Sequence, residues 1–176
     1  MEQHQKIFKL ASVLLQYPEP EWLLADDLRQ EIIDLDNRTI REIYLQFVDY
    51  MEIHGVERLA EQYVGTFDFS DTTTLYLTYH RFGDNPDRGP AFIKLREEFA
   101  SAGYPLEDDE LPDYLPLVLE FASIASPEHA RKIFMIHKQT IDRLLAELDK
   151  ADSPYRWIIQ ALVHAIDAFL AESKAS

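Results

Sequence analysis

The spacing of apolar residues is the feature that most restricts how this 176-residue chain can fold. In the N-terminal segment, Ile7, Leu10 and Leu14 recur at steps of three and four. This period places apolar side chains on one face of an α-helix. Segments with the same apolar spacing make up most of the remaining chain. Prolines or glycines, which begin or end helices, separate these segments. The pattern therefore predicts an all-α protein.

The helical segments are expected to pack as a single domain over residues 1–176, because a chain of this length can bury a substantial core. Asn37 is a suitable N-cap, and Ser126 and Ser153 are each followed by a proline suited to a first helical turn. Ile32 and Ile33 are both expected to face inward. The expected helices, with their caps, cover residues 5–17, 19–33, 37–55, 56–67, 72–80, 89–102, 112–125, 126–150 and 153–170, followed by a frayed tail at 171–176. We predict a bundle of about eight or nine helices.

The segment TTTLYLTYH, residues 72–80, has an alternative interpretation. Its alternation of β-branched and aromatic residues is also typical of a β-strand. We favour a helix capped by Thr72, Thr73 or Thr74, since nothing else in the chain offers a strand to pair with it and a lone strand is unstable.

Charge and composition exclude several classes of function. The chain has 32 Asp and Glu against 17 Lys and Arg, a net charge of -15, so we expect it to bind neither nucleic acid nor an anionic membrane surface. This negative charge favours a cationic partner. The sequence has no cysteine, which fits a reducing compartment, and no apolar run approaches the length of a membrane span. We therefore expect a cytoplasmic protein without direct membrane insertion.

The acidic residues are concentrated in one stretch. No Lys or Arg occurs between Arg96 and Arg131, and this interval should create a negative surface potential. Inside it, the segment ELPDYLPLVLEF combines an acidic beginning with an apolar body. Pro112 is suited to a first helical turn, where Asp113 would lie near the positive end of the helix dipole. The interval contains Glu97, Glu98, Glu107, Asp108, Asp109, Glu110, Asp113, Glu120 and Glu128.

Two stretches together resemble a known family. TFDFSDTTTLYLTYHRFGDNPDRGPA, followed by ELPDYLPLVLEF, is similar to the NarJ-type nitrate reductase molybdenum cofactor assembly chaperones, within the TorD/DmsD group of redox enzyme maturation chaperones. The acidic-proline signature of that group falls on Glu110, Pro112 and Asp113. It often continues with histidine, and this chain has Tyr114 there. The family's loop pattern falls on Tyr79, His80, Gly83, Asp84, Arg88 and Gly89.

The resemblance implies a TorD-like helical fold and a chaperone rather than an enzyme. The implied partner is the basic, amphipathic N-terminal peptide of the immature catalytic (alpha) subunit of a respiratory nitrate reductase. The chaperone would hold this apo-enzyme ready for molybdenum cofactor insertion before membrane attachment, without a cofactor of its own. The implied client-binding residues are Glu110, Leu111, Asp113, Tyr114 and Leu117. The loop residues would brace the groove or touch the client.

Residues for catalysis or metal binding are sparse. The five glycines are too scattered for a phosphate-binding loop, and no HExxH or ExxH pattern occurs. One cluster supports an alternative hypothesis, a nucleotide- or metal-dependent enzyme with its site near His80, Asp84 and Asp87. A capping or buried, hydrogen-bonded histidine is the simpler interpretation of His80. We therefore predict no catalytic residues and no metal site.

Overall fold

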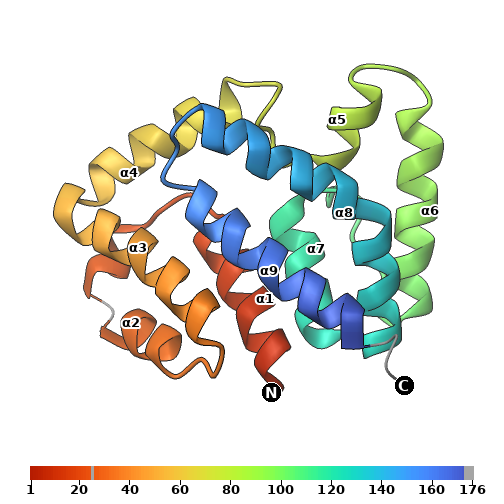
Figure 1. Ribbon diagram of the computed structural model, residues 1–176. Coiled ribbons are helices and arrows are strands. Elements are labelled where there is room, and N and C mark those ends of the chain that lie inside the picture. Colours follow the sequence, from red (N-terminus) through yellow and green to blue (C-terminus); the bar gives the residue numbers. More distant parts are fainter. Residues whose placement is uncertain (25, 173–176) are drawn as a thin grey trace.

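The computed structural model describes residues 1–24 and 26–172, and these residues form nine α-helices (Figure 1). They contain no β-strand, only an isolated antiparallel bridge between Tyr76 and Tyr114. The predicted all-α fold is confirmed. The helices are α1 Gln3–Leu14, α2 Asp26–Ile33, α3 Arg38–His54, α4 Val56–Tyr63, α5 Leu77–Phe82, α6 Arg88–Ser101, α7 Leu115–Ile124, α8 Pro127–Lys150 and α9 Arg156–Glu172, with short helical turns at Pro20–Leu24 and Val64–Asp68.

The first and last helices lie at the centre of the bundle. α1 packs against α7 and α9, while α9 also contacts α3 and α8 (Figure 1). Phe8 of α1 is fully buried, and its ring centroid lies 4.7 Å from that of Phe134 on α8 and 5.7 Å from that of Phe169 on α9. This shared aromatic core joins segments from both ends of the sequence. No helix within the described ranges has the length and apolar character needed to span a membrane.

Several expected boundaries are confirmed at the atomic level. Asn37 caps α3, because its side-chain oxygen accepts a hydrogen bond from the Ile40 N–H at 3.0 Å. Ser126 caps α8 in the same way through the His129 N–H, at 3.5 Å. Gly55 joins α3 to α4 with a φ of 83°, a conformation that side chains other than glycine adopt with strain. Of the expected tail 171–176, the two described residues belong to α9 and the rest lie outside the described residues.

The second predicted helix is divided in two. A short 3-10 turn, Pro20–Leu24, precedes α2, whose first turn carries Asp26 and Asp27 at the positive end of the helix dipole. Ile33 was expected to face inward, but its side chain is 43% exposed. The short α2 buries Ile32 instead, and the adjacent position on the helix turns toward solvent.

Two other helices begin later than predicted, and for a common reason. The Leu77 N–H donates to the Asp113 carbonyl, and the Leu115 N–H donates to the Leu75 carbonyl, both at 2.9 Å. These bonds pair Tyr76 with Tyr114, and the backbones of both residues are extended. α5 therefore begins at Leu77 without a threonine side-chain cap, and α7 begins at Leu115 rather than Pro112.

Candidate functional site

A pocket of about 340 Å³ opens between the end of α1, the start of α7 and the acidic turn before it. We call it the acidic pocket. Four of the five predicted client-binding residues line it, namely Glu110, Leu111, Tyr114 and Leu117. The complete lining is Gln16, Tyr76, Asp109, Glu110, Leu111, Tyr114, Pro116, Leu117 and Glu120. The ELPD segment and the first turn of α7 thus form most of one surface.

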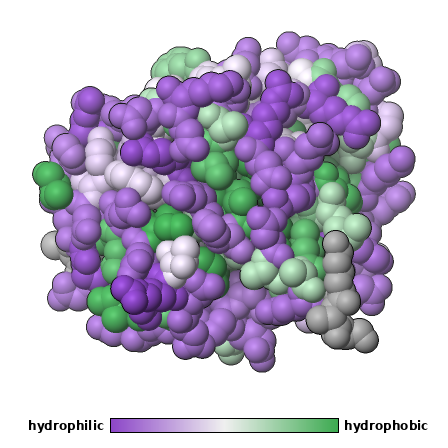
Figure 2. Space-filling view, in the orientation of Figure 1, coloured by the Kyte–Doolittle hydropathy of each residue, from purple (hydrophilic) through white to green (hydrophobic). Residues whose placement is uncertain are grey.

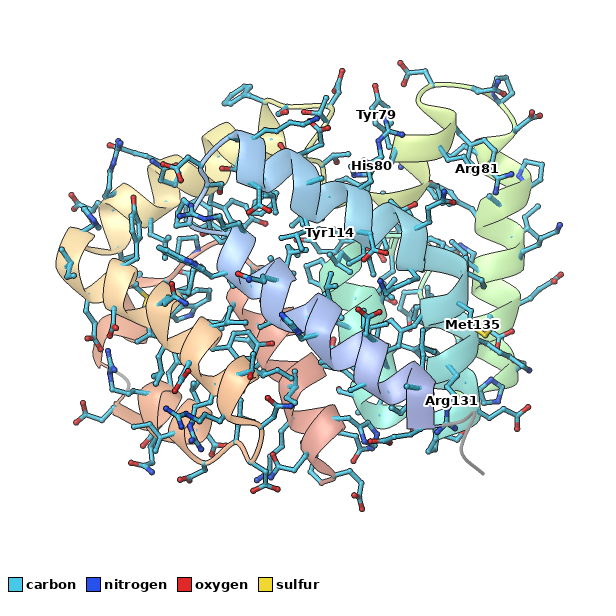
Figure 3. All side chains as sticks on the ribbon, in the orientation of Figure 1. Tyr79, His80, Arg81, Tyr114, Arg131 and Met135 are labelled. Atoms are coloured by element: carbon cyan, nitrogen blue, oxygen red, sulfur yellow. The ribbon has the colours of Figure 1, made fainter. Side chains whose placement is uncertain are left out.

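The apolar part of this pocket is accessible. Leu111 and Tyr76 are each 38% exposed, while Tyr114 and Leu117 are half-buried. The rings of Tyr76 and Tyr114 lie 5.2 Å apart, which extends the apolar surface across the bridge between their backbones. Tyr114 lies at the centre of the view in Figure 3, with its hydroxyl 3.5 Å from that of Tyr63. The pocket therefore has an ordered aromatic wall and an exposed leucine.

The charged part of the lining is wholly acidic, consisting of Asp109, Glu110 and Glu120. The nearby Arg96 does not neutralise these carboxylates. Its guanidinium donates instead to main-chain carbonyls of the acidic turn, at 3.1 Å from Glu107 and 3.3 Å from Asp108, and also to the carbonyl of Glu110. Arg96 thus stabilises the turn and leaves its negative side chains at the surface. Lys9 of α1 pairs with Glu120 at 2.7 Å.

Asp113, the fifth predicted client-binding residue, does not line the pocket. It is fully buried, and its Oδ2 accepts hydrogen bonds from the Thr78 N–H at 3.0 Å and the Thr78 hydroxyl at 2.6 Å. Arg88 donates to the same oxygen at 3.3 Å and, through Nε, to the Thr78 hydroxyl at 2.8 Å. The prediction that Asp113 contacts the client requires an accessible carboxylate, and the structure instead buries it, because it faces α5 and α6.

Among the loop residues of the family pattern, Arg88 belongs to this buried network and Tyr79 lies next to it. The Arg88 guanidinium lies 5.5 Å from the Tyr79 ring centroid, and Figure 3 shows Tyr79 and His80 on α5 at the upper end of the molecule. His80 Nε2 lies 2.8 Å from the Thr74 carbonyl, which can only accept, so this nitrogen donates. Burial lowers the His80 pKa. Gly83 ends α5 with a φ of 54°, Asp84 is exposed in the loop, and Gly89 lies in the first turn of α6.

The alternative metal site receives no geometric support. Asp84 and Asp87 are exposed, and His80 already uses Nε2 for the Thr74 carbonyl. Across residues 1–24 and 26–172, no group of three or more His, Asp or Glu side chains is arranged to hold a metal ion.

Sequence reasoning missed several residues of the site. Gln16 and Tyr76 reach the pocket from separate elements, and Thr78 meets Asp113 from 35 positions away. No local pattern indicates such contacts. The sequence shows Arg96 as the last cation before the acidic interval. Only the structure shows that its guanidinium donates to main-chain carbonyls rather than to carboxylates.

Comparison with known proteins identifies the family of this chain. Residues 34–158 match the family described as nitrate reductase delta subunit. The chain is 37% identical over 164 residues to the probable nitrate reductase molybdenum cofactor assembly chaperone NarJ of Bacillus subtilis, covering 93% of this chain and 89% of that protein. It is 25% identical over 170 residues to NarJ of Escherichia coli K12, a nitrate reductase molybdenum cofactor assembly chaperone, covering 95% of this chain and 72% of that protein. The family match includes every residue of the acidic pocket except Gln16.

Proposed function

This chain belongs to the nitrate reductase delta subunit family of NarJ-type assembly chaperones, and we propose that it acts on the catalytic subunit of a respiratory nitrate reductase. The acidic pocket binds the basic, amphipathic N-terminal segment of that subunit. Binding takes place in the cytoplasm, before the enzyme attaches to its membrane anchor, and holds the apo-enzyme open for molybdenum cofactor insertion. The observation that supports this proposal is an exposed apolar wall beside three lining carboxylates, of which Glu120 is paired with Lys9, whereas Asp109 and Glu110 form no ion pair among the described residues.

The two parts of the pocket contribute differently to binding. An amphipathic helix that places leucine or phenylalanine side chains against Leu111 and Leu117 gains affinity by burying apolar surface. Its Lys and Arg side chains are oriented by Asp109 and Glu110, and the same charges accelerate association. Arg96 keeps the acidic turn in place before the client arrives, which reduces the entropy lost on binding.

The chaperone role requires only binding. A protein that binds the immature client shifts the population toward that form by mass action. Release follows when cofactor insertion produces a state that binds less well. The chaperone itself holds no prosthetic group in this scheme, and no catalytic residue is involved.

Titration calorimetry with a synthetic peptide of the client's N-terminal segment tests the proposal. We expect a Kd between micromolar and nanomolar, or about 8 to 12 kcal/mol of binding free energy. Leu111→Ser should weaken binding about tenfold by removing apolar contact, and Asp109→Lys should weaken it about three- to tenfold by reversing one charge.

Matched surface variants provide the controls. Ile53→Ser removes an apolar side chain that is 77% exposed on α3, and Asp36→Lys reverses an exposed charge away from the pocket. Both should bind the peptide as the wild type does. Equal effects of Leu111→Ser and Ile53→Ser, or no saturable binding of the peptide by the wild type, would place the client elsewhere.

A further inference from the structure

A second pocket, of about 660 Å³, lies between the end of α1, the segment 18–20 that follows it, and α4. We call it the Tyr17 pocket. It is larger than the acidic pocket, of about 340 Å³, and the two share no lining residue. Its volume is in the range of ligand sites. The lining, which is mostly apolar, consists of Tyr17, Pro18, Glu19, Pro20, Val56, Glu57, Ala60, Glu61, Val64, Gly65 and Phe69.

Two aromatic side chains of this lining are exposed. Phe69 is 84% exposed, more than any other large apolar side chain among the described residues, and Tyr17 is 50% exposed. Phe69 follows the π-helical turn Val64–Asp68, which extends α4, and such turns occur frequently at functional sites. Exposed aromatic residues beside a pocket are typical of surfaces that bind a segment of another protein. The Tyr17 pocket therefore offers apolar contact area that the described chain leaves uncovered.

The charged part of this lining is also wholly acidic, consisting of Glu19, Glu57 and Glu61. All three residues are exposed. Glu61 pairs with Arg58 of α4 at 2.8 Å, whereas Glu19 and Glu57 form no ion pair within the ranges 1–24 and 26–172. An apolar surface beside unpaired carboxylates is the same combination that the acidic pocket presents. The charge of the Tyr17 pocket is therefore complementary to a basic, amphipathic segment.

The two pockets are neighbours. Consecutive residues at the end of α1 line them, Gln16 in the acidic pocket and Tyr17 in the other. The Tyr17 ring centroid lies 5.7 Å from that of Tyr63, an edge-to-face contact, and the Tyr63 hydroxyl lies 3.5 Å from the hydroxyl of Tyr114 in the acidic pocket. Tyr63 is buried, so these contacts are part of the packed core beneath the surface. A continuous aromatic support thus connects the walls of the two pockets.

We propose that the acidic pocket and the Tyr17 pocket form one groove, which a single helix of the client's basic, amphipathic segment occupies along its length. Apolar side chains at one end of this helix contact Leu111 and Leu117, and those at the other end contact Tyr17 and Phe69. Recognition of an amphipathic helix uses apolar anchors repeated over successive turns, which two adjacent pockets supply better than one. This inference rests on the proposed function, because it extends the same binding site.

Calorimetry with the synthetic client peptide tests the contribution of the second pocket. Phe69→Ser should weaken binding about three- to tenfold by removing apolar contact, and Glu57→Lys should weaken it about threefold by reversing one charge. Ile93→Ser removes an apolar side chain that is 60% exposed on α6, outside both pockets, and should leave the affinity unchanged. One peptide should bind per chaperone, because both pockets hold the same helix.

A nitroxide label on either end of the peptide shows whether it spans both pockets. In NMR spectra of the ¹⁵N-labelled chaperone, a label on one end should broaden the Val64 and Gly65 amides, and a label on the other end should broaden those of Leu111 and Leu117. Labels on both ends that broaden only one pocket, or two bound peptides per chaperone, would overturn the shared groove.

The same variants separate failure of this inference from failure of the proposed function. If Leu111→Ser weakens binding while Phe69→Ser behaves as Ile93→Ser does, the groove does not extend to the Tyr17 pocket, and the proposed function stands. If Phe69→Ser weakens binding and Leu111→Ser does not, the client occupies the Tyr17 pocket alone, and both proposals are wrong as stated. Absence of saturable peptide binding by the wild type would also overturn both.

Discussion

Asp113 is held to α5 by both its main chain and its side chain. Its carbonyl accepts from the Leu77 N–H, and its carboxylate accepts from Thr78 and from Arg88 of α6. The next residue, Tyr114, lines the acidic pocket. If the acidic pocket binds the client as proposed, Asp113 is therefore a positioning residue, which acts through the geometry of its neighbour rather than by touching the client.

Replacing the Asp113 carboxylate should reduce stability. Asp113→Asn keeps the shape of the side chain but removes the negative charge that Arg88 faces. Water reaches the partly exposed Arg88 and reduces the cost of breaking the pair, so we expect a loss of about 2 kcal/mol in the free energy of unfolding. Asp109→Asn, at the exposed rim, should change it by less than about 0.5 kcal/mol. Urea denaturation measures both values. Similar stabilities of the two variants would contradict a structural role for Asp113.

His137 makes stability depend on pH in a defined window. Its folded-state pKa of about 4 lies below the ordinary value of 6.5, because burial disfavours the charged imidazole more than Asp113 favours it. The unfolded chain therefore binds more protons between these pH values, and acidification from about 6.5 to about 4 should cost up to about 3 kcal/mol. The penalty is absent above that window.

Variants separate this contribution from that of the carboxylates. His137→Gln should remove the part of the pH dependence between pH 6.5 and about 4, measured as the difference from wild type in denaturation series. His164→Gln, which replaces an exposed histidine of α9, is the matched control. If both variants follow the wild-type curve, His137 does not resist protonation in the folded state.

At the scale of the elements, a helix boundary could be predicted from the sequence when the residues that determine it lie close together in the chain. The beginnings of α3 and α8 are determined by a side chain within three residues of the N–H that it caps, at Asn37 and Ser126. Such boundaries are readable from the sequence. The beginnings of α5 and α7 depend on each other, because residues 75–77 and 113–115 exchange main-chain hydrogen bonds only after the chain has folded.

The candidate site also has features that depend on nearby residues and features that depend on contacts between distant segments. Four predicted pocket residues lie within the eight positions from Glu110 to Leu117, so a local motif was enough to bring them together. Exposure at each position could not be inferred in the same way. Asp113 and Glu110 are both acids of one motif, yet one is buried against Thr78 and the other lines the pocket. The difference arises from packing by α5 and α6, which the motif does not contain.

At the scale of the whole molecule, negative charge is the dominant property. The face shown in Figure 2 is mainly hydrophilic, with apolar side chains exposed in limited patches. Under the proposed function, the net charge of -15 attracts a cationic client before contact, because the field of the whole protein extends to about one Debye length. The acidic pocket would then act on the client at short range.

These two contributions predict a specific dependence on salt. Raising the salt concentration from about 20 mM to about 500 mM should slow association of the client peptide about tenfold or more, and change its dissociation by less than about twofold. Stopped-flow measurements with a fluorescent peptide give both rates. Neutralising Asp109, Glu110 and Glu120 together changes the net charge only from -15 to -12, so most of the salt dependence of association should persist. Complete loss of that dependence in the triple variant would show that steering comes from the pocket alone, and an unchanged dependence with unchanged affinity would exclude these carboxylates from the client site.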